Sequence, residues 1–117
     1  MKTYPQLRAE AESRTRQVTP RQVLDMQDRG EPVVLVDIRE NQEVNAVKIP
    51  GSVHVPRSHL ESRIEAQVAR DANVVLYCGS GNRSVLAADT LQTMGYSTVA
   101  SMSGGIRGWA DAGGEVE

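Results

Sequence analysis

Short apolar runs alternate along the chain with longer segments in which polar and apolar residues mix. The runs at 33–38 and 74–77 are uninterrupted and rich in β-branched residues, which is typical of strands covered on both faces of a parallel sheet. Shorter segments with strand character lie at 16–19, 53–55 and 97–100. The pattern therefore predicts up to five strands.

The segments between these strands carry helix signals. In Thr19-Pro20-Arg21-Gln22, threonine is a good N-cap, proline fits the first helical position and glutamine fits the third, so a helix is predicted from there to Gly30. Leu60, Ile64 and Val68 recur at a spacing of four, which indicates a helix with one apolar face over 58–70. Further helices are expected over 5–16, 40–47 and 84–94, with a short one opening at Gly104-Gly105.

Strands that alternate with helices indicate an α/β fold with a mainly parallel sheet. Residues 1–16 are interpreted as an N-terminal helical extension and residues 17–117 as one domain. Ligands of such sheets bind beyond the carboxyl ends of the strands. Cys78 follows one predicted strand at that end, Asp37 lies near the end of another, and residues 101–105 follow a third.

Composition restricts the range of partners. The 117 residues carry a formal net charge of −2 at pH 7, whereas nucleic-acid binders usually present a basic patch, so no nucleic-acid partner is expected. No apolar run reaches the roughly 18 residues of a membrane span, and the polar N-terminus predicts no signal peptide. The chain has one cysteine and so no internal disulfide, and we expect a cytoplasmic protein without membrane contact.

The candidate chemistry lies in one hexapeptide. Between the run at 74–77 and the helix expected at 84–94 stands Cys78-Gly79-Ser80-Gly81-Asn82-Arg83. A loop that turns from a strand into a helix aims backbone N–H groups and the helix dipole at one spot, which lowers the pKa of a thiol. The forked guanidinium of Arg83 suits an oxyanion. A lone cysteine at a strand end is more often a small buried hydrophobe, but this glycine-rich loop with its arginine favours a reactive thiolate.

Four patches stand out along the chain: Val18-Thr19-Pro20; residues 36–40 with 49–52 and 55–56; residues 77–84; and residues 104–109. In this order they resemble the rhodanese-like family over roughly residues 17–117. Each patch alone is a weak signal, and the four together are specific. The chain departs from the family at Val44, where an aromatic residue is usual, and at Val47-Lys48, where a Gly-His pair is usual.

The resemblance implies a central, mostly parallel five-stranded sheet flanked by helices, and sulfur transfer through a cysteine persulfide. Cys78 matches the sulfur-carrying cysteine. Substrate binding is expected from the cradle formed by Gly79, Ser80, Gly81, Asn82, Arg83 and Ser84. The expected partners are a small anionic sulfur donor such as thiosulfate and a cyanide or thiol acceptor, or a protein that exchanges persulfide sulfur. No cofactor is implied.

Two other kinds of function compete with this one. Cysteine-dependent phosphatases, and arsenate reductases by analogy, use a similar cradle, but phosphatases place five residues between cysteine and arginine, whereas four separate Cys78 from Arg83. The shorter loop makes a smaller cup, and no acid is evident near it to protonate a leaving alkoxide. Rhodanese-like domains also act as regulatory modules or as persulfide carriers with little turnover. Retention of the cysteine and the arginine favours catalysis.

Histidines are not expected to take part in the chemistry. His54 and His59 stand at no spacing that implies contact with Cys78, so a structural or exposed role is preferred for both. Two scattered histidines and one cysteine also make no metal-site pattern.

The remaining polar candidates are interpreted mainly as structural. Asp37 could face the loop and orient it, but an internal ion pair, such as Arg39 with Glu43, is preferred because charges near a core are usually paired. Arg107 is equally compatible with the pocket rim and with solvent. Trp109 is expected to anchor the core.

Overall fold

The computed structural model describes residues 1–117 and contains one five-stranded sheet in which every neighbouring pair is parallel, in the order β1-β5-β4-β2-β3. The strands are β1 (Arg16–Val18), β2 (Val34–Asp37), β3 (Val53–His54), β4 (Val74–Tyr77) and β5 (Val99–Met102). The predicted α/β class and the five-stranded sheet are confirmed.

Six α-helices surround the sheet. They are α1 (Tyr4–Arg14), α2 (Pro20–Asp28), α3 (Asn41–Ala46), α4 (Leu60–Gln67), α5 (Asn82–Thr93) and α6 (Gly105–Asp111), with a single 3-10 turn, η1 (Arg57–His59), before α4. The predicted start of α2 is confirmed, because the hydroxyl of Thr19 accepts the N–H of Gln22 at 3.1 Å and the Gln22 side chain accepts the N–H of Thr19 at 2.8 Å. No helix is long and apolar enough to cross a membrane.

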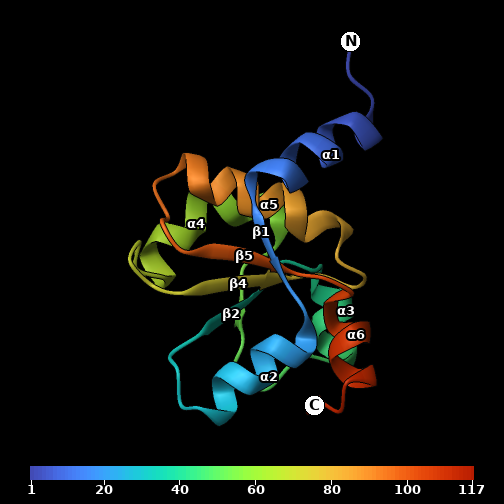
Figure 1. Ribbon diagram of the computed structural model, residues 1–117, viewed down its shortest axis with the longest axis vertical. Helices are drawn as coiled ribbons and strands as arrows, with labels where there is room; N and C mark the ends of the chain where they lie inside the picture. The colour runs from blue at the N-terminus through green and yellow to red at the C-terminus, as the bar shows by residue number, and fades with distance from the viewer.

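Two apolar layers hold the sheet. Helices α4 and α5 cover one face and α2 and α6 cover the other (Figure 1). The predicted stripe of α4 is confirmed, since Leu60, Ile64 and Val68 are all buried in the first layer. Trp109 is buried in the second layer and donates its indole N–H to the carbonyl of Glu115, so its predicted role as a core anchor is confirmed.

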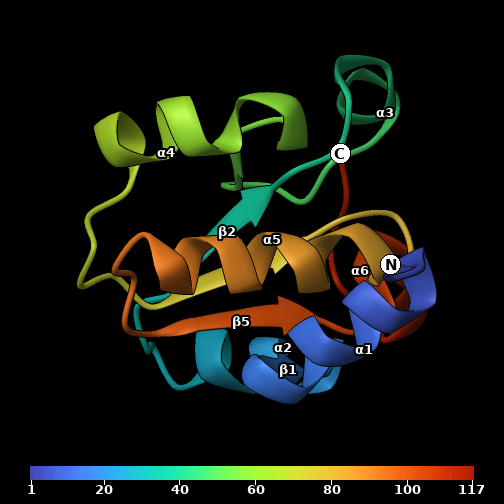
Figure 2. The same ribbon diagram turned by 90° about the horizontal axis from the view of Figure 1, so that it is seen from above.

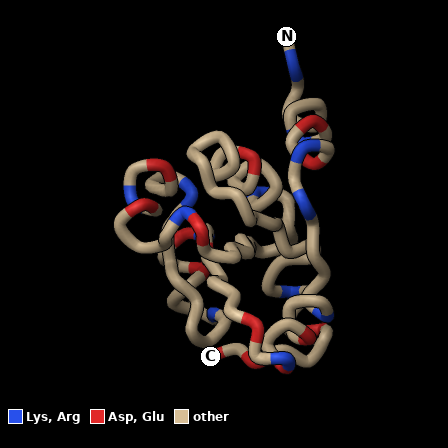
Figure 3. Tube along the Cα trace, turned by 60° about the vertical axis from the view of Figure 1, so that its left-hand side comes forward, with Lys and Arg blue, Asp and Glu red and all other residues tan.

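Helix α1 lies outside these two layers and packs on α5 (Figures 1 and 2). Ala11 is its one buried residue. Arg14 donates two hydrogen bonds, of 3.1 and 2.8 Å, to the carboxylate of Asp89 on α5. Basic and acidic positions interleave along α1 and along the rest of the chain (Figure 3). The helix is therefore tied to the domain by one small side chain and by exposed polar contacts.

Register brings three strand ends to one edge of the sheet. Tyr77, the last residue of β4, pairs with Asp37 of β2, and Leu76 pairs with Ser101 of β5. The residues that follow β2, β4 and β5 consequently meet at the carboxyl edge, where ligands of parallel sheets bind. Cys78 lies in the middle of this edge.

Most elements differ from their predicted bounds by one to three residues, and the differences at β5 and α5 change the site. Strand β5 runs from Val99 to Met102 rather than over 97–100, so Ser101 is a strand residue. Helix α5 begins at Asn82 rather than Ser84, because Gly81 takes a left-handed conformation with φ +99° and ends the loop there. Arg83 thus stands in the first turn of α5, where its N–H has no partner within the helix.

Candidate active site

The loop after β4 is held from outside by the start of α6. The N–H of Ile106 donates to the carbonyl oxygen of Cys78 at 2.9 Å, and the N–H of Arg107 donates to that of Gly79 at 3.3 Å. Gly105 makes this approach close. It has φ +57°, and a Cβ at this position would overlap the carbonyl groups of Cys78 and Gly79. Only glycine is accommodated, because any side chain would separate α6 from the loop.

The sulfur of Cys78 is surrounded by hydrogen-bonding groups. The N–H of Gly81 donates to Sγ at 3.1 Å, and the hydroxyl oxygen of Ser84 lies 3.6 Å from it. Burial by itself raises the pKa of this 1% exposed residue, but hydrogen bonds from the Ser84 hydroxyl and from the N–H groups of Ser84, Gly81 and Arg83 outweigh burial and lower the pKa below its usual value. The arrangement therefore favours a thiolate.

Ser84 is itself held by a second hydroxyl. Its Oγ lies 2.7 Å from Oγ of Ser101 on β5 and 3.3 Å from the carbonyl of Gly81, to which it donates. Both serines are fully buried. The sequence placed Ser101 at the carboxyl edge of the sheet, in the segment 101–105, but did not indicate a contact between Ser101 and the cysteine loop. Ser101 now stands directly behind the residue that contacts the sulfur.

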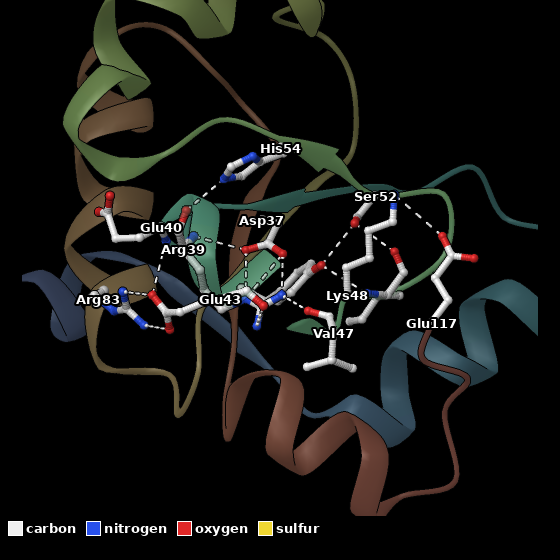
Figure 4. Close-up of polar contacts among 12 residues, drawn as sticks. Asp37, Arg39, Glu40, Glu43, Val47, Lys48, Ser52, His54, Arg83 and Glu117 are labelled. Atoms are coloured by element: carbon white, nitrogen blue, oxygen red, sulfur yellow. Dashed lines mark hydrogen bonds and ion pairs between the residues drawn. The ribbon is translucent and has the colours of Figure 1, made fainter. Parts of the chain in front are cut away.

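Arg83 is paired with a carboxylate. Its two terminal nitrogens donate to the two oxygens of Glu43 on α3, each at 3.0 Å (Figure 4). Glu43 also accepts the N–H of Glu40 at 3.1 Å, through the capping box that begins α3. The hydrogen bond from Arg83 lowers the pKa of Glu43 to about 2, against the opposing effect of partial burial. A fixed anion thus stands beside the predicted anion-binding arginine.

A carboxylate that the sequence did not indicate lies beside the loop. Glu43 and Arg83 are forty positions apart in the sequence, and only the docking of α3 at the carboxyl edge of the sheet brings them together. The one sequence signal was the spacing of Glu40 and Glu43, which suits a capping box. That signal predicts the start of a helix and says nothing about a partner on another element.

Asp37 and Arg39 form a separate buried pair. Arg39 is 3% exposed and donates to both carboxylate oxygens of Asp37, with its closest contact at 2.8 Å (Figure 4). The same guanidinium donates to the carbonyl of Val47 at 2.6 Å. The predicted internal ion pair is confirmed, with Asp37 rather than Glu43 as the partner of Arg39. This pair ties the strand end to the segment that follows α3.

Two loop side chains hydrogen-bond away from the sulfur. Asn82 donates to the hydroxyl of Ser80 at 3.5 Å and accepts from Nε of Arg8 on α1 at 3.1 Å. The structure thus brings Gly81 and Ser84 to Cys78, while the side chains of Ser80 and Asn82 lie on the outer side of the loop. Arg8, which lies in the predicted extension, was not identified from the sequence.

Neither histidine contacts Cys78. His54 hydrogen-bonds through Nε2 to the carbonyl of Arg39 at 2.8 Å (Figure 4), and His59 is exposed. The side chain of Arg107 is also exposed, although its N–H holds the loop. The structural or exposed role predicted for the histidines is confirmed.

Comparisons with known proteins agree on one family. The model of the rhodanese-like domain matches residues 19–112. A sulfurtransferase of Allochromatium vinosum is 39% identical over 83 residues, which are 71% of this chain and 77% of that protein. The probable adenylyltransferase/sulfurtransferase MoeZ of Mycobacterium tuberculosis is 35% identical over 94 residues, which are 80% of this chain but 24% of MoeZ. This chain therefore spans about a quarter of that relative.

One solved structure covers the whole chain. It is a protein of unknown function from Rhodopseudomonas palustris, described as a possible tyrosine phosphatase, with 36% identity and a TM-score of 0.90 over 100% of this chain and 96% of that one. Its extent includes α1, which lies outside the matched family model.

Proposed function

The chain belongs to the rhodanese-like domain family, and from that premise we propose that it is a sulfurtransferase that carries a sulfane sulfur as a persulfide on Cys78. The observation that carries the proposal is the surroundings of the sulfur. An N–H at 3.1 Å, a hydroxyl at 3.6 Å and the start of α5 favour a negative charge at Sγ. The same groups can stabilise the charge of a persulfide, which lies on its outer sulfur.

The first step loads the cysteine. The Cys78 thiolate attacks the outer sulfur of a sulfane donor such as thiosulfate, a new S–S bond forms, and the donor's own S–S bond breaks with its electron pair leaving on sulfite. No proton, oxidant or reductant is consumed. Gly79, Ser80, Gly81, Asn82 and Arg83 supply the binding loop, with Ser84 at its base.

The second step transfers the sulfur from Cys78 to the acceptor. Cyanide or an acceptor thiolate attacks the outer sulfur of the persulfide, and the S–S bond breaks with its electron pair returning to Cys78. Thiocyanate or an acceptor persulfide leaves, and the thiolate is regenerated. Splitting the transfer in two lets one buried site serve donor and acceptor in turn.

Phosphatase chemistry fits this site less well, although the R. palustris neighbour is described as a possible tyrosine phosphatase. The loop has four rather than five residues between Cys78 and Arg83, which narrows the cup. A phosphatase also needs an acid to protonate the leaving oxygen. Glu43 is the acid beside the loop, and a pKa of about 2 keeps it ionised at neutral pH. It cannot act as that acid.

Intact mass after incubation with thiosulfate tests the proposal. We expect a gain of one sulfur atom in the native chain, removed by cyanide with release of thiocyanate, and no gain in Cys78→Ser. Activity that persists in Cys78→Ser would refute the mechanism. Steady turnover of thiosulfate and cyanide distinguishes an enzyme from a persulfide carrier, which would load once and release sulfur slowly.

A further inference from the structure

We propose that Glu43 is a specificity-determining residue that occupies the anion-binding fork of Arg83 and biases Cys78 towards sulfur donors of low negative charge. The favoured class comprises monoanionic thiosulfonates and persulfides, and the disfavoured class comprises dianions such as thiosulfate. This inference rests on the proposed sulfur transfer and adds a preference for donors of a particular charge.

The terminal edge of the Arg83 guanidinium is occupied. A guanidinium binds a carboxylate or an oxyanion best through two parallel N–H donors, and the two terminal nitrogens of Arg83 both donate to Glu43 at 3.0 Å. An incoming sulfonate group must displace this carboxylate to use the same two donors, or bind the remaining N–H groups of Arg83 beside it. In both cases it meets the negative charge of Glu43.

Glu43 is anchored independently of Arg83. The N–H of Glu40 donates to the same carboxylate at 3.1 Å, as part of the capping box of α3. The pair also sits against the loop, since the atoms nearest to a hypothetical Cβ on Gly79 are a terminal nitrogen of Arg83 at 3.5 Å and a carboxylate oxygen of Glu43 at 3.9 Å. The carboxylate of Glu43 is thus held in place and lines the site beside Gly79.

Charge around the sulfur accounts for the expected preference. The thiolate, Arg83 and Glu43 together carry one negative charge, whereas the thiolate and Arg83 alone would carry none. Two other guanidiniums close to this region are paired with carboxylates, Arg39 with Asp37 and Arg8 with Glu12 at 2.7 Å, whereas the exposed Arg107, whose N–H donates to Gly79, has no carboxylate partner. Coulomb energy is proportional to the charge of the incoming ion, so Glu43 opposes a dianion twice as strongly, in free energy, as a monoanion.

The test compares two donors that react by the same displacement. Thiosulfate releases sulfite, and methanethiosulfonate, a monoanion, releases methanesulfinate. The second-order rate constant of persulfide formation is measured with each donor for the native chain, for Glu43→Gln and for Glu12→Gln. Glutamine keeps one oxygen for the N–H of Glu40 and removes the charge, and it also replaces the oxygen that accepts from the second terminal nitrogen of Arg83 with an NH2 group. Glu12→Gln is the matched control, because it also removes a carboxylate paired with an arginine that contacts the loop.

We expect Glu43→Gln to accelerate the reaction with thiosulfate about tenfold and that with methanethiosulfonate about threefold, since the effect on a dianion is the square of that on a monoanion. Glu12→Gln should change the ratio of the two rates less than Glu43→Gln does, because Arg8 contacts the loop only through Asn82, on its outer side. Slower reaction of Glu43→Gln with thiosulfate, or equal acceleration with both donors, would overturn the inference, because Glu43 would then only position Arg83.

A second measurement needs no variant. If the site repels dianions, raising the ionic strength should increase the rate of thiosulfate relative to methanethiosulfonate in the native chain, because salt screens exposed charges. A falling ratio would mean a net attractive site and would also overturn the inference. Failure of the native chain to gain sulfur from either donor would instead refute the proposed function, so the two ideas fail separately.

Discussion

The hydroxyl oxygens of Ser84 and Ser101 lie 2.7 Å apart in the buried layer behind Cys78. Ser84 is the only hydrogen-bond partner of the Ser101 hydroxyl, so we expect the Ser101 hydroxyl to donate to the hydroxyl oxygen of Ser84. That leaves the proton of Ser84 free to turn from the carbonyl of Gly81 towards a negatively charged sulfur. Chains of such hydrogen bonds strengthen one another in a buried site.

Ser101→Ala should therefore raise the pKa of Cys78, and Ser84→Ala should raise it further, because Ser84 contacts the sulfur directly and a net hydrogen bond is worth about 1 kcal/mol. The measurement is the pH dependence of alkylation by iodoacetamide, whose midpoint in the native chain should lie below that of an ordinary cysteine, because the pKa is lowered. Ser101→Thr keeps a hydroxyl and serves as the control. An unchanged midpoint in Ser101→Ala would show that this serine only fills space.

Gly105→Ala should lower the free energy of unfolding by about 3 kcal/mol, from the steric overlap and the left-handed backbone together. Its Cβ would overlap the carbonyls of Cys78 and Gly79. Gly30→Ala is the matched control, because Gly30 has φ +73° but open space around it, and it should cost about 1 kcal/mol. Urea denaturation measures both, and similar losses would mean that the contact between α6 and the loop is not tight.

The contribution of Glu43 to stability should depend on pH. Its folded pKa of about 2 lies below the ordinary value of about 4.3, so the stabilisation is fully present above the ordinary value and is lost as the pH falls through the folded one. The difference in unfolding free energy between the native chain and Glu43→Gln should be largest above about pH 5 and should vanish near pH 2. A difference that stays constant over this range would argue against the ion pair.

A chain that starts at Arg16, so that β1 stays whole, tests the proposed division into an extension and a domain to within one residue. We expect it to unfold cooperatively and to form the persulfide, with a stability loss of about 1–2 kcal/mol, because α1 buries only Ala11 and adds the exposed pair of Arg14 with Asp89. A truncated chain that fails to fold would refute the division. Arg8→Ala, which removes the contact with Asn82 but keeps α1, separates loss of packing from loss of loop support.

Local signals gave much of the fold in advance. The β-branched runs became β2 and β4, the Thr19-Pro20 signature became the start of α2, and Cys78 was placed at a strand end. Each of these depends on neighbours within a few residues, where propensity, capping and periodicity act.

The contacts that the sequence did not predict join residues that lie far apart in the sequence. Glu43 meets Arg83 only because α3 and α5 both start at the carboxyl edge, and Ser101 meets Ser84 only because β5 extends two residues further than its composition suggested. Gly81 has a left-handed conformation, which moves the start of α5 to Asn82. Gly81 also lies close to Gly104, because a Cβ on Gly81 would be 3.0 Å from the backbone nitrogen of Gly104. No local pattern encodes such tertiary contacts.

The hydrogen bonds from Ile106 and Arg107 to the loop of Cys78 have a consequence for the order in which the protein acquires its reactivity. A chain synthesised only as far as α5 would contain the whole cysteine loop but not the segment that holds its carbonyls. That chain also lacks β5, whose Ser101 holds Ser84, so the hydrogen bonds that lower the pKa of Cys78 would not all be in place. An acidic thiol would emerge only when the last helix docks, so the rate of alkylation at mildly acidic pH can report on completed folding.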